Sequence, residues 1–158
     1  MIERKGNYVY KTAEVLNADW REKFASIMEY MHFPAFIKFI PNGYVTKYID
    51  GYDLQEDKPF NYRHDIVRAY PLNDTQRQGV IKILKDVVFS GLKTGYILGD
   101  FTKRNIIIKS DTPYLIDYDV IIEEFNEDYI RIYQTMLDYL QIEYEFKGNL
   151  KELHERLS

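Results

Sequence analysis

The chain has 158 residues, of which 46% are hydrophobic and 29% are charged, and this is enough apolar material for one core in a single domain over residues 1–158. The 21 basic and 25 acidic residues give a net charge of -4, which is too balanced for a nucleic-acid-binding surface or a disordered acidic tail. Cysteine is absent, which excludes disulfides, thiolate metal ligands and cysteine nucleophiles.

The first residues, MIERKGNYVYK, mix charges of both signs and lack the apolar run of a secretion signal. No later run reaches the roughly 18 apolar residues that a membrane span needs. We therefore expect a soluble protein of the cytoplasm, with no membrane span and no direct contact with nucleic acid.

The first third of the sequence predicts a small β-sheet with one helix. Residues 7–11 alternate with the period of a strand, and residues 19–31 place large apolar side chains on one helical face. Two β-rich runs, 36–40 and 44–49, flank the sequence Pro-Asn-Gly at residues 41–43, which favours a hairpin turn.

The middle of the chain predicts one long helix after an irregular stretch. Residues 52–73 show no clear period, and we expect a loop there with room for a short helix. From Asp74 to about Leu92 the pattern predicts a helix that is capped by Asn73 or Asp74. The broad apolar face of this helix indicates a central, buried position.

The last third predicts a loop, a β-hairpin and a second long helix. A turn-like loop at residues 99–105 leads into two apolar strands, at residues 105–109 and 114–119. A final helix, capped by Asn126, repeats apolar side chains at helical spacing as far as Leu140. Together the predicted elements indicate the α+β class.

Three polar residues in this last third have the spacing of a catalytic site. Asp100 lies five residues before Asn105 in one loop, so both side chains can face one cleft, and the hairpin returns the chain so that Asp117 faces the same cleft. Phosphoryl transfer needs a group that orients the attacking hydroxyl and oxygen ligands for magnesium, and these residue types supply both. The alternative is structural, because Asp and Asn commonly cap turns and Asp117 ends a strand.

This pattern resembles the kinase superfamily, whose catalytic loop runs Asp-x-x-x-x-Asn before a β-hairpin that ends in a metal-binding aspartate. Residues 98–100, Leu-Gly-Asp, are similar to the His-Gly-Asp of aminoglycoside phosphotransferases and of the small RIO-type and tRNA-modification-complex kinases. Residues 115–119, Leu-Ile-Asp-Tyr-Asp, resemble the Leu-Ile-Asp-Phe-Asp of lipopolysaccharide core kinases. The resemblance implies that Asp100 is the base, that Asn105 and Asp117 bind Mg²⁺, and that ATP is the phosphate donor.

The same resemblance implies a truncated kinase-like fold. The reduced N-lobe, about residues 1–50, would be a small β-sheet plus a helix, and the reduced C-lobe, about residues 51–158, would be mainly helical.

Two earlier segments resemble the nucleotide-binding parts of a kinase. Residues 44–54 are similar to the hinge, which implies that the backbone of Lys47 and Ile49 binds the adenine edge and that Asp53 lies near the ribose. Val-Tyr-Lys, ending at Lys11, resembles the strand whose lysine pairs with the phosphates. Each segment alone also reads as an ordinary strand, so the order of all three segments carries the resemblance.

The sequence also departs from the kinase pattern. A single glycine precedes Lys11, so we expect the glycine-rich loop over the phosphates to be missing. The apolar face of helix 19–31 carries no acid that could pair with Lys11. Asp119 replaces a glycine of the family and is either a further metal ligand or a solvated acid, while Lys103 and Arg104 either bind an anionic group or are solvated.

Two functions from different classes remain open. The first is an atypical minimal kinase that transfers the γ-phosphate of ATP to a hydroxyl of an unidentified substrate. The second is a pseudokinase that binds a nucleotide or a protein partner without transfer. A third, more distant hypothesis is a metal-dependent hydrolase that uses Asp100, Asp117 and Asp119.

Overall fold

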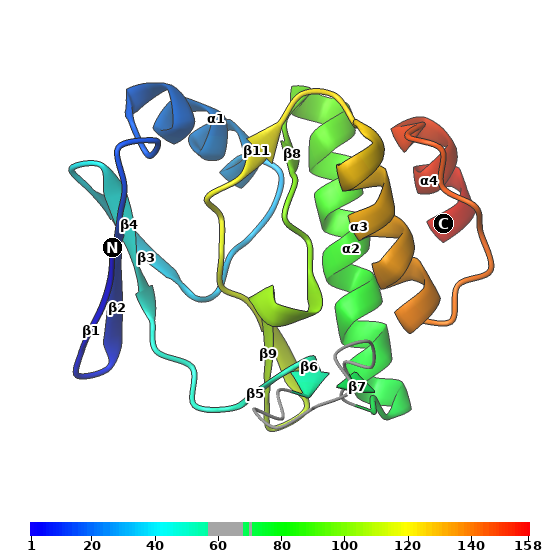
Figure 1. Ribbon diagram of the computed structural model, residues 1–158, viewed down its shortest axis with the longest axis horizontal. Coiled ribbons are helices and arrows are strands. Elements are labelled where there is room, and N and C mark those ends of the chain that lie inside the picture. The colour runs from blue at the N-terminus through cyan, green and yellow to red at the C-terminus, as the bar shows by residue number, and fades with distance from the viewer. Residues whose placement is uncertain (57–67, 70) are drawn as a thin grey trace.

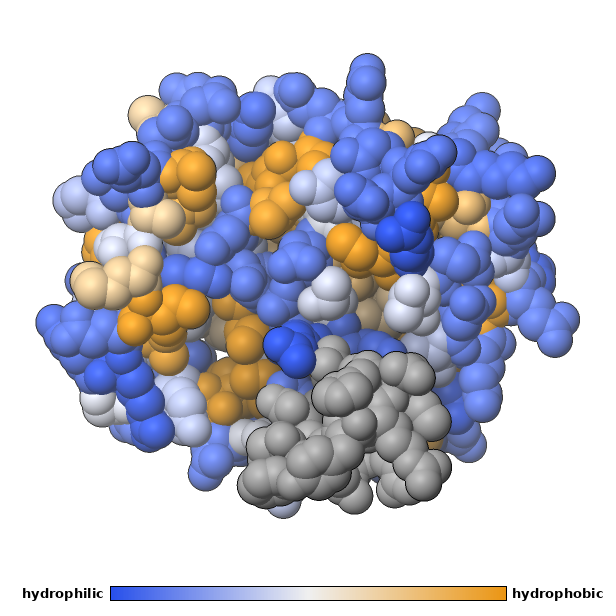
Figure 2. Space-filling view, viewed as in Figure 1, coloured by the Kyte–Doolittle hydropathy of each residue, from blue (hydrophilic) through white to orange (hydrophobic). Residues whose placement is uncertain are grey.

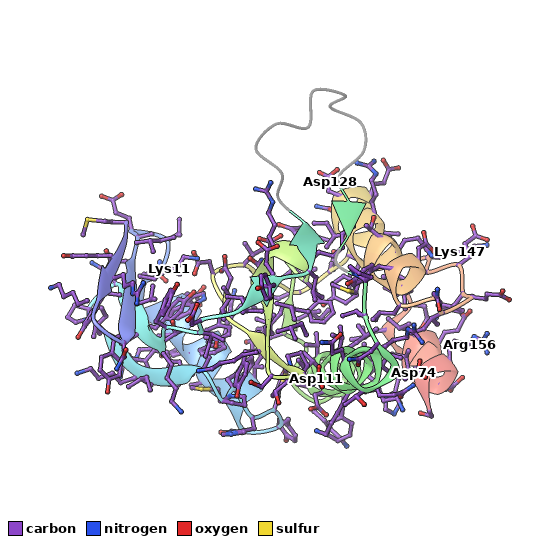
Figure 3. All side chains as sticks on the ribbon, turned by 90° about the horizontal axis from the view of Figure 1, so that it is seen from below. Lys11, Asp74, Asp111, Asp128, Lys147 and Arg156 are labelled. Atoms are coloured by element: carbon purple, nitrogen blue, oxygen red, sulfur yellow. The ribbon has the colours of Figure 1, made fainter. Side chains whose placement is uncertain are left out.

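The structure is a computed structural model that describes residues 1–56, 68–69 and 71–158. These residues form antiparallel β-sheets and α-helices (Figure 1), which confirms the predicted α+β class. A four-stranded sheet with one helix forms one end of the molecule, helices α2, α3 and α4 form the other end, and a β-hairpin lies between them, as Figures 1 and 3 both show.

The N-terminal sheet has the strand order β1-β2-β4-β3, and every pairing in it is antiparallel. Asn42 has a φ of 55° in the predicted turn, and a Cβ atom at Gly43 would collide with the Lys11 carbonyl oxygen, so this hairpin requires Asn-Gly. The sequence predicts β2 and the β3-β4 hairpin but misses β1, because all four side chains of β1 are exposed and show no alternation. The strands are β1 (Ile2–Lys5), β2 (Tyr8–Thr12), β3 (Phe36–Ile40) and β4 (Gly43–Lys47).

Helix α1 (Ala18–Met28) packs against the sheet with the face that the sequence predicts. The Asn17 side chain caps it by accepting a hydrogen bond from the Trp20 N–H at 3.1 Å. Trp20 and Phe24 are buried, and their rings stack with centroids 5.4 Å apart. The helix ends at Met28 rather than at the predicted Met31, although Met31 is also buried.

The helical end of the molecule contains α2, α3 and α4. The capping box at Asn73 starts α2, and Gly95, with a φ of 79°, ends it. The sequence predicts α2 and α3 but misses α4, a short helix that packs on α2 and buries Leu153 and Leu157. None of the described helices is long and apolar enough to cross a membrane. Their bounds are Asp74–Thr94 for α2, Glu127–Tyr139 for α3 and Leu150–Leu157 for α4.

Short strands fill the space between the sheet and the helices. β9 pairs with β10 and with β5, β8 pairs with β11, and β6 pairs with β7. The predicted strand at residues 114–119 is wrong beyond Leu115, because residues 116–120 leave the hairpin and Tyr118 is buried among aromatic rings. Part of the predicted loop at residues 52–73, namely 57–67 and 70, lies outside the described residues. The remaining elements are β5 (Tyr52–Asp53), β6 (Gln55–Glu56), β7 (Arg68–Ala69), β8 (Ile97–Leu98), the 3₁₀ turn η1 (Lys103–Asn105), β9 (Ile106–Lys109), β10 (Thr112–Leu115) and β11 (Ile121–Ile122).

Three buried tyrosines predict a loss of stability in alkali. Burial raises the phenol pKa of Tyr44, Tyr118 and Tyr133 above the ordinary value of 10.0, so the folded chain keeps protons that the unfolded chain releases. Above pH 10 the folded state therefore binds more protons, and the free energy of unfolding falls by about 1.4 kcal/mol per pH unit for each retained proton. Urea unfolding at several pH values between 9 and 11 measures this slope. Tyr133→Phe should reduce the slope by one proton, with the exposed Tyr30→Phe as control, and a slope equal in both variants would contradict the prediction.

Candidate functional site

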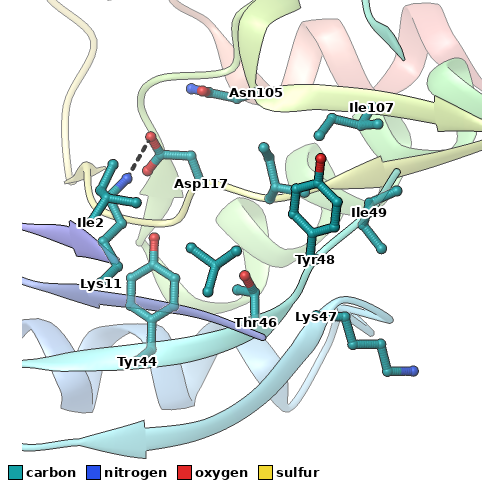
Figure 4. Close-up of a pocket in the computed structure, with 12 residues that line it drawn as sticks. Ile2, Lys11, Tyr44, Thr46, Lys47, Tyr48, Ile49, Asn105, Ile107 and Asp117 are labelled. Atoms are coloured by element: carbon teal, nitrogen blue, oxygen red, sulfur yellow. Dashed lines mark ion pairs between the residues drawn. The ribbon is translucent and has the colours of Figure 1, made fainter. Parts of the chain in front are cut away.

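A cavity of about 280 Å³ lies where the N-terminal sheet meets the β9-β10 hairpin (Figure 4). Its apolar walls come from opposite sides: Ile2 and Val9 belong to β1 and β2, whereas Ile107 and Ile116 belong to β9 and to the chain after β10. In Figure 2 the surface is hollowed between the two ends of the molecule, and hydrophobic side chains are visible in the hollow. An apolar slot with a few polar groups is the usual form of a small-molecule site.

Lys11 on β2 contributes a positive charge to this cavity. Its Nζ lies 2.9 Å from Asp117 Oδ2, an ion pair drawn in Figure 4, and 3.0 Å from Asp119 Oδ2. The three side chains are only 16%, 22% and 24% exposed, so water screens the ion pairs incompletely. Burial lowers the pKa of Lys11, but hydrogen bonds and negative charge from Asp117 and Asp119 outweigh it and raise the pKa above its usual value. Lys11 is therefore charged at neutral pH.

Asp119, in the segment after β10, pairs with Lys11 and is hydrogen-bonded to Tyr44 of β4. The Tyr44 hydroxyl donates a hydrogen bond to Asp119 Oδ1 at 2.6 Å and accepts one from the Tyr118 N–H at 3.1 Å. Burial raises the pKa of Asp119 and the Asp117 charge adds to this, while the hydrogen bonds from Tyr44 and Lys11 oppose the rise. Asp119 is thus paired with Lys11 and hydrogen-bonded to Tyr44 in this arrangement, and it is neither free nor solvated.

Helix α1 positions the Asp117–Asp119 segment through its single tryptophan. The buried Trp20 indole N–H donates to the Tyr118 carbonyl at 2.9 Å, and the Tyr118 hydroxyl donates to the Leu115 carbonyl at 2.7 Å. The Asp119 N–H also donates to Asp117 Oδ1 at 3.1 Å. These bonds hold the two carboxylates at a fixed separation although the segment belongs to no helix or strand.

Asp100 and Asn105 lie close together, as their spacing predicts. The Asn105 side-chain amide donates to the Asp100 carbonyl at 2.8 Å and to Asp100 Oδ2 at 3.2 Å. Both donors of the buried Asn105 face Asp100, which leaves its Oδ1 as the acceptor for another partner. The Ile116 N–H donates to the Asn105 carbonyl at 3.0 Å and so places Asp117 next to this loop. Asn105 and Asp117 both line the cavity, and Asp100 lies behind Asn105, outside the set of lining residues.

The predicted hinge residues line the cavity on the side of β4. The Lys47 N–H donates to the Ala35 carbonyl at 2.8 Å and its side chain points away from the cavity (Figure 4), so only the Lys47 carbonyl remains for a ligand. The Ile49 N–H makes no hydrogen bond to any described residue. Asp53 does not line the cavity, but it lies on β5 directly opposite Ile107, which does.

The donor set fits magnesium better than a metal with nitrogen or sulfur ligands. No group of three or more His, Cys, Asp or Glu is arranged for a metal in the described part of the chain. Asn105 Oδ1 and the Asp117 carboxylate nevertheless supply two hard oxygen ligands at the cavity. Mg²⁺ is commonly bound through one or two protein oxygens together with phosphate oxygens and water, so these residues fit that ion.

A search against models of known protein families found no match, and neither did a search of curated proteins. The function must therefore be inferred from the geometry of the site alone. Five of the seven predicted site residues line the one cavity, and the other two, Asp100 and Asp53, each contact or face a residue that lines it. The apolar walls of the cavity and the contacts of Tyr44 and Asp119 with each other and with Lys11 were not predicted from the sequence, although Tyr44 lies in the predicted hinge strand.

Tyr44→Phe is expected to lower the free energy of unfolding by about 1–3 kcal/mol. The substitution leaves the buried Tyr118 N–H without its acceptor and removes a hydrogen bond to Asp119. Urea unfolding at pH 7 measures the change, with the exposed Tyr30→Phe as the matched control. A change below about 0.5 kcal/mol would show that these bonds contribute little to stability.

Proposed function

We propose that the chain is a small kinase-like phosphotransferase, which transfers the γ-phosphate of ATP to a hydroxyl group of a substrate. One observation carries the proposal: a single cavity is lined by Lys11, by the backbone at Lys47 and Ile49, and by Asn105 and Asp117. These residues come from three distant segments of the chain, and each matches the segment of a kinase that has the corresponding role.

The apolar slot fits the adenine ring of ATP. The ring would lie between Val9 on one side and Ile107 and Ile116 on the other, with the flat contact that branched side chains give an aromatic ring. The adenine edge offers a donor and an acceptor, and the Lys47 carbonyl and the Ile49 N–H are an acceptor and a donor that remain free for it among the described residues. The ribose would then point towards β5, where Asp53 lies.

The phosphates would lie at the charged end of the cavity. Lys11 would pair with phosphate oxygens, while Asp119 and Tyr44 keep the lysine in position. Asn105 and Asp117 would hold Mg²⁺, which neutralises charge on the transferring phosphate. Breaking the ion pair between Lys11 and Asp117 would free both side chains for these partners.

Asp100 is the residue that we assign to the acceptor hydroxyl. Its carboxylate would accept a hydrogen bond from the hydroxyl and then its proton, as the acceptor oxygen bonds to the γ-phosphorus. The bond between that phosphorus and the bridging oxygen breaks, and ADP leaves with the electron pair. The Asn105 amide, bonded to Asp100 Oδ2, orients the carboxylate. The absence of cysteine suits a reducing compartment, and we place the reaction in the cytoplasm.

One observation favours a pseudokinase as the second candidate. Lys11 neutralises Asp117, the proposed metal ligand, so the unliganded site is already paired. If ATP does not displace this ion pair, the cavity binds a nucleotide or serves as a partner-binding module without transfer.

The two candidates differ in one assay. Purified protein is incubated with γ-labelled ATP and magnesium, with and without a cell extract as the source of acceptors, and thermal shift is measured in parallel. Phosphotransfer predicts ATP-dependent stabilisation and label transfer, and both should be lost in Asp117→Ala. If ATP stabilises the natural chain but no label is transferred, the pseudokinase is supported. If the natural chain shows neither stabilisation by ATP nor label transfer, a nucleotide site in this chain is rejected.

A further inference from the structure

A second groove, of about 310 Å³, lies between the loop after Asp100 and helix α3. The loop contributes Phe101, Thr102 and Lys103 to the groove. Helix α3 contributes Arg131, Ile132, Thr135 and Met136. Phe101 and Met136 are buried, so the groove has an apolar base, while the basic and hydroxyl side chains give it a polar, positively charged part.

Both basic side chains of the groove are available to an anion. Lys103 has no carboxylate partner among the described residues, and its ammonium lies 5.4 Å from the centroid of the Tyr139 ring. Among the described residues, Arg131 pairs only with Asp128, which Figure 3 labels on α3, at 3.7 Å, and these side chains are 73% and 79% exposed. An ion pair this long and exposed contributes little, so a ligand can replace it at small cost. Arg104 is exposed and is not among the lining residues.

The groove also offers a free hydroxyl group. Thr102 occupies the N-cap position of η1, but its side chain makes no capping hydrogen bond. The half-buried Thr102 hydroxyl has no partner among the described residues. Two cations and a free hydroxyl next to an apolar base are complementary to a molecule that carries anionic oxygens and a less polar body.

The groove begins next to the residue that we assign to the acceptor hydroxyl. Thr102 lies two residues after Asp100, so their Cα atoms are at most about 7 Å apart. The Thr102 N–H donates to the Asp100 carbonyl at 2.9 Å, which keeps this turn tight. Asp100 itself does not line the groove, so an acceptor bound there would reach Asp100 only by extending past Thr102.

We propose that this groove binds the acceptor substrate, and that the acceptor is a small hydroxyl-bearing anion whose phosphate or carboxylate contacts Lys103 and Arg131. The proposal rests on the proposed function, since it assigns the groove to the same reaction. It excludes cationic acceptors, which the positive charges of Lys103 and Arg131 would repel.

Binding is tested without phosphate transfer, by two-dimensional NMR of the ¹⁵N-labelled chain. The probes are glucose 6-phosphate, gluconate and glucose, which share their hydroxyl groups and differ in the anionic group. The phosphate or carboxylate probe, or both, should shift the amides of residues 101–103 and 131–136, and glucose should not. The anionic probe that binds more tightly, glucose 6-phosphate or gluconate, shows whether the groove prefers a phosphate or a carboxylate. Equal shifts with glucose, or no shifts with either anion, would overturn the proposal.

Charge-removing variants then locate the anion. Lys103→Gln and Arg131→Gln should each weaken binding of the anionic probe by about tenfold, while Lys85→Gln, an exposed lysine on α2, should leave binding unchanged. The same NMR spectra show whether each variant is folded. ATP binding is measured separately by thermal shift. Anion binding in the groove by a chain that binds no ATP would overturn the acceptor role and the proposed function together, whereas ATP binding without anion binding would overturn the groove alone.

Discussion

Asp100→Asn is expected to lower phosphate transfer by roughly 10²- to 10⁴-fold while leaving ATP binding unchanged. The substitution removes the carboxylate that, in the proposed reaction, would accept the proton of the attacking hydroxyl, but it keeps the size of the side chain. Asp100 does not line the cavity proposed to bind ATP, so the dissociation constant for ATP should stay within about twofold of that of the natural chain. Label transfer from γ-labelled ATP measures the rate, and thermal shift with ATP and magnesium measures binding.

The control for this prediction is Asp111→Asn. Asp111 is an exposed aspartate in the turn between β9 and β10, and it does not line the cavity proposed to bind ATP. It should transfer phosphate at the natural rate. Transfer by Asp100→Asn that remained within threefold of the natural chain would show that Asp100 is not the base, and the role of the loop would then be structural.

Asp117→Asn is expected to weaken magnesium-dependent ATP binding at least about tenfold and to abolish detectable transfer. The asparagine keeps an oxygen in place of Asp117 Oδ1, which accepts a hydrogen bond from the Asp119 N–H. It removes the charge that pairs with Lys11 and that, in the proposed site, would bind the metal. ATP binding is measured with magnesium and with EDTA, because the difference between the two isolates the contribution of the metal.

Asp119→Asn is the matched variant for Asp117. Asp119 contacts Lys11 and Tyr44 and does not line the cavity, so Asp119→Asn should lower stability and ATP affinity but keep the dependence on magnesium. Loss of magnesium dependence in both variants would favour a metal site built on both carboxylates, which is the arrangement of the hydrolase hypothesis.

Much of the fold follows from local signals in the sequence. Asn73 and Asn126 cap the two long helices, and their apolar side chains recur at helical spacing, so both helices could be predicted close to their true bounds. Helix α4 was missed, because it buries only Leu153 and Leu157 and becomes stable by packing on α2. The stretch after β10 alternates like a strand, yet contacts from Trp20 and Tyr44, far away in sequence, turn Tyr118 into the core.

The candidate site likewise has one part that follows from local sequence spacing and another part that depends on long-range packing. The spacing of Asp100, Asn105 and Asp117 along one loop and hairpin is local, and the structure places Asn105 beside Asp100 and in one cavity with Asp117. The environment of Lys11 depends instead on packing of the N-terminal sheet against the segment after β10, since its partners Asp117 and Asp119 are more than 100 residues away. No local pattern marks Asp119 as the partner of Lys11, because the contact exists only once β2, β4 and the segment after β10 have met.

The most direct test of the account is to locate the metal of the bound nucleotide. Mn²⁺ can replace Mg²⁺ and broadens the NMR signals of nearby amides, so small amounts of Mn²⁺ are added to the ¹⁵N-labelled chain in the presence of ATP. The account predicts selective loss of the amide signals of Asn105, Ile116 and Asp117, with the signal of Leu153 on α4 unchanged. Three results would contradict the assignment of this cavity as a magnesium-ATP site: no broadening, broadening that occurs without ATP, or broadening centred on another part of the chain.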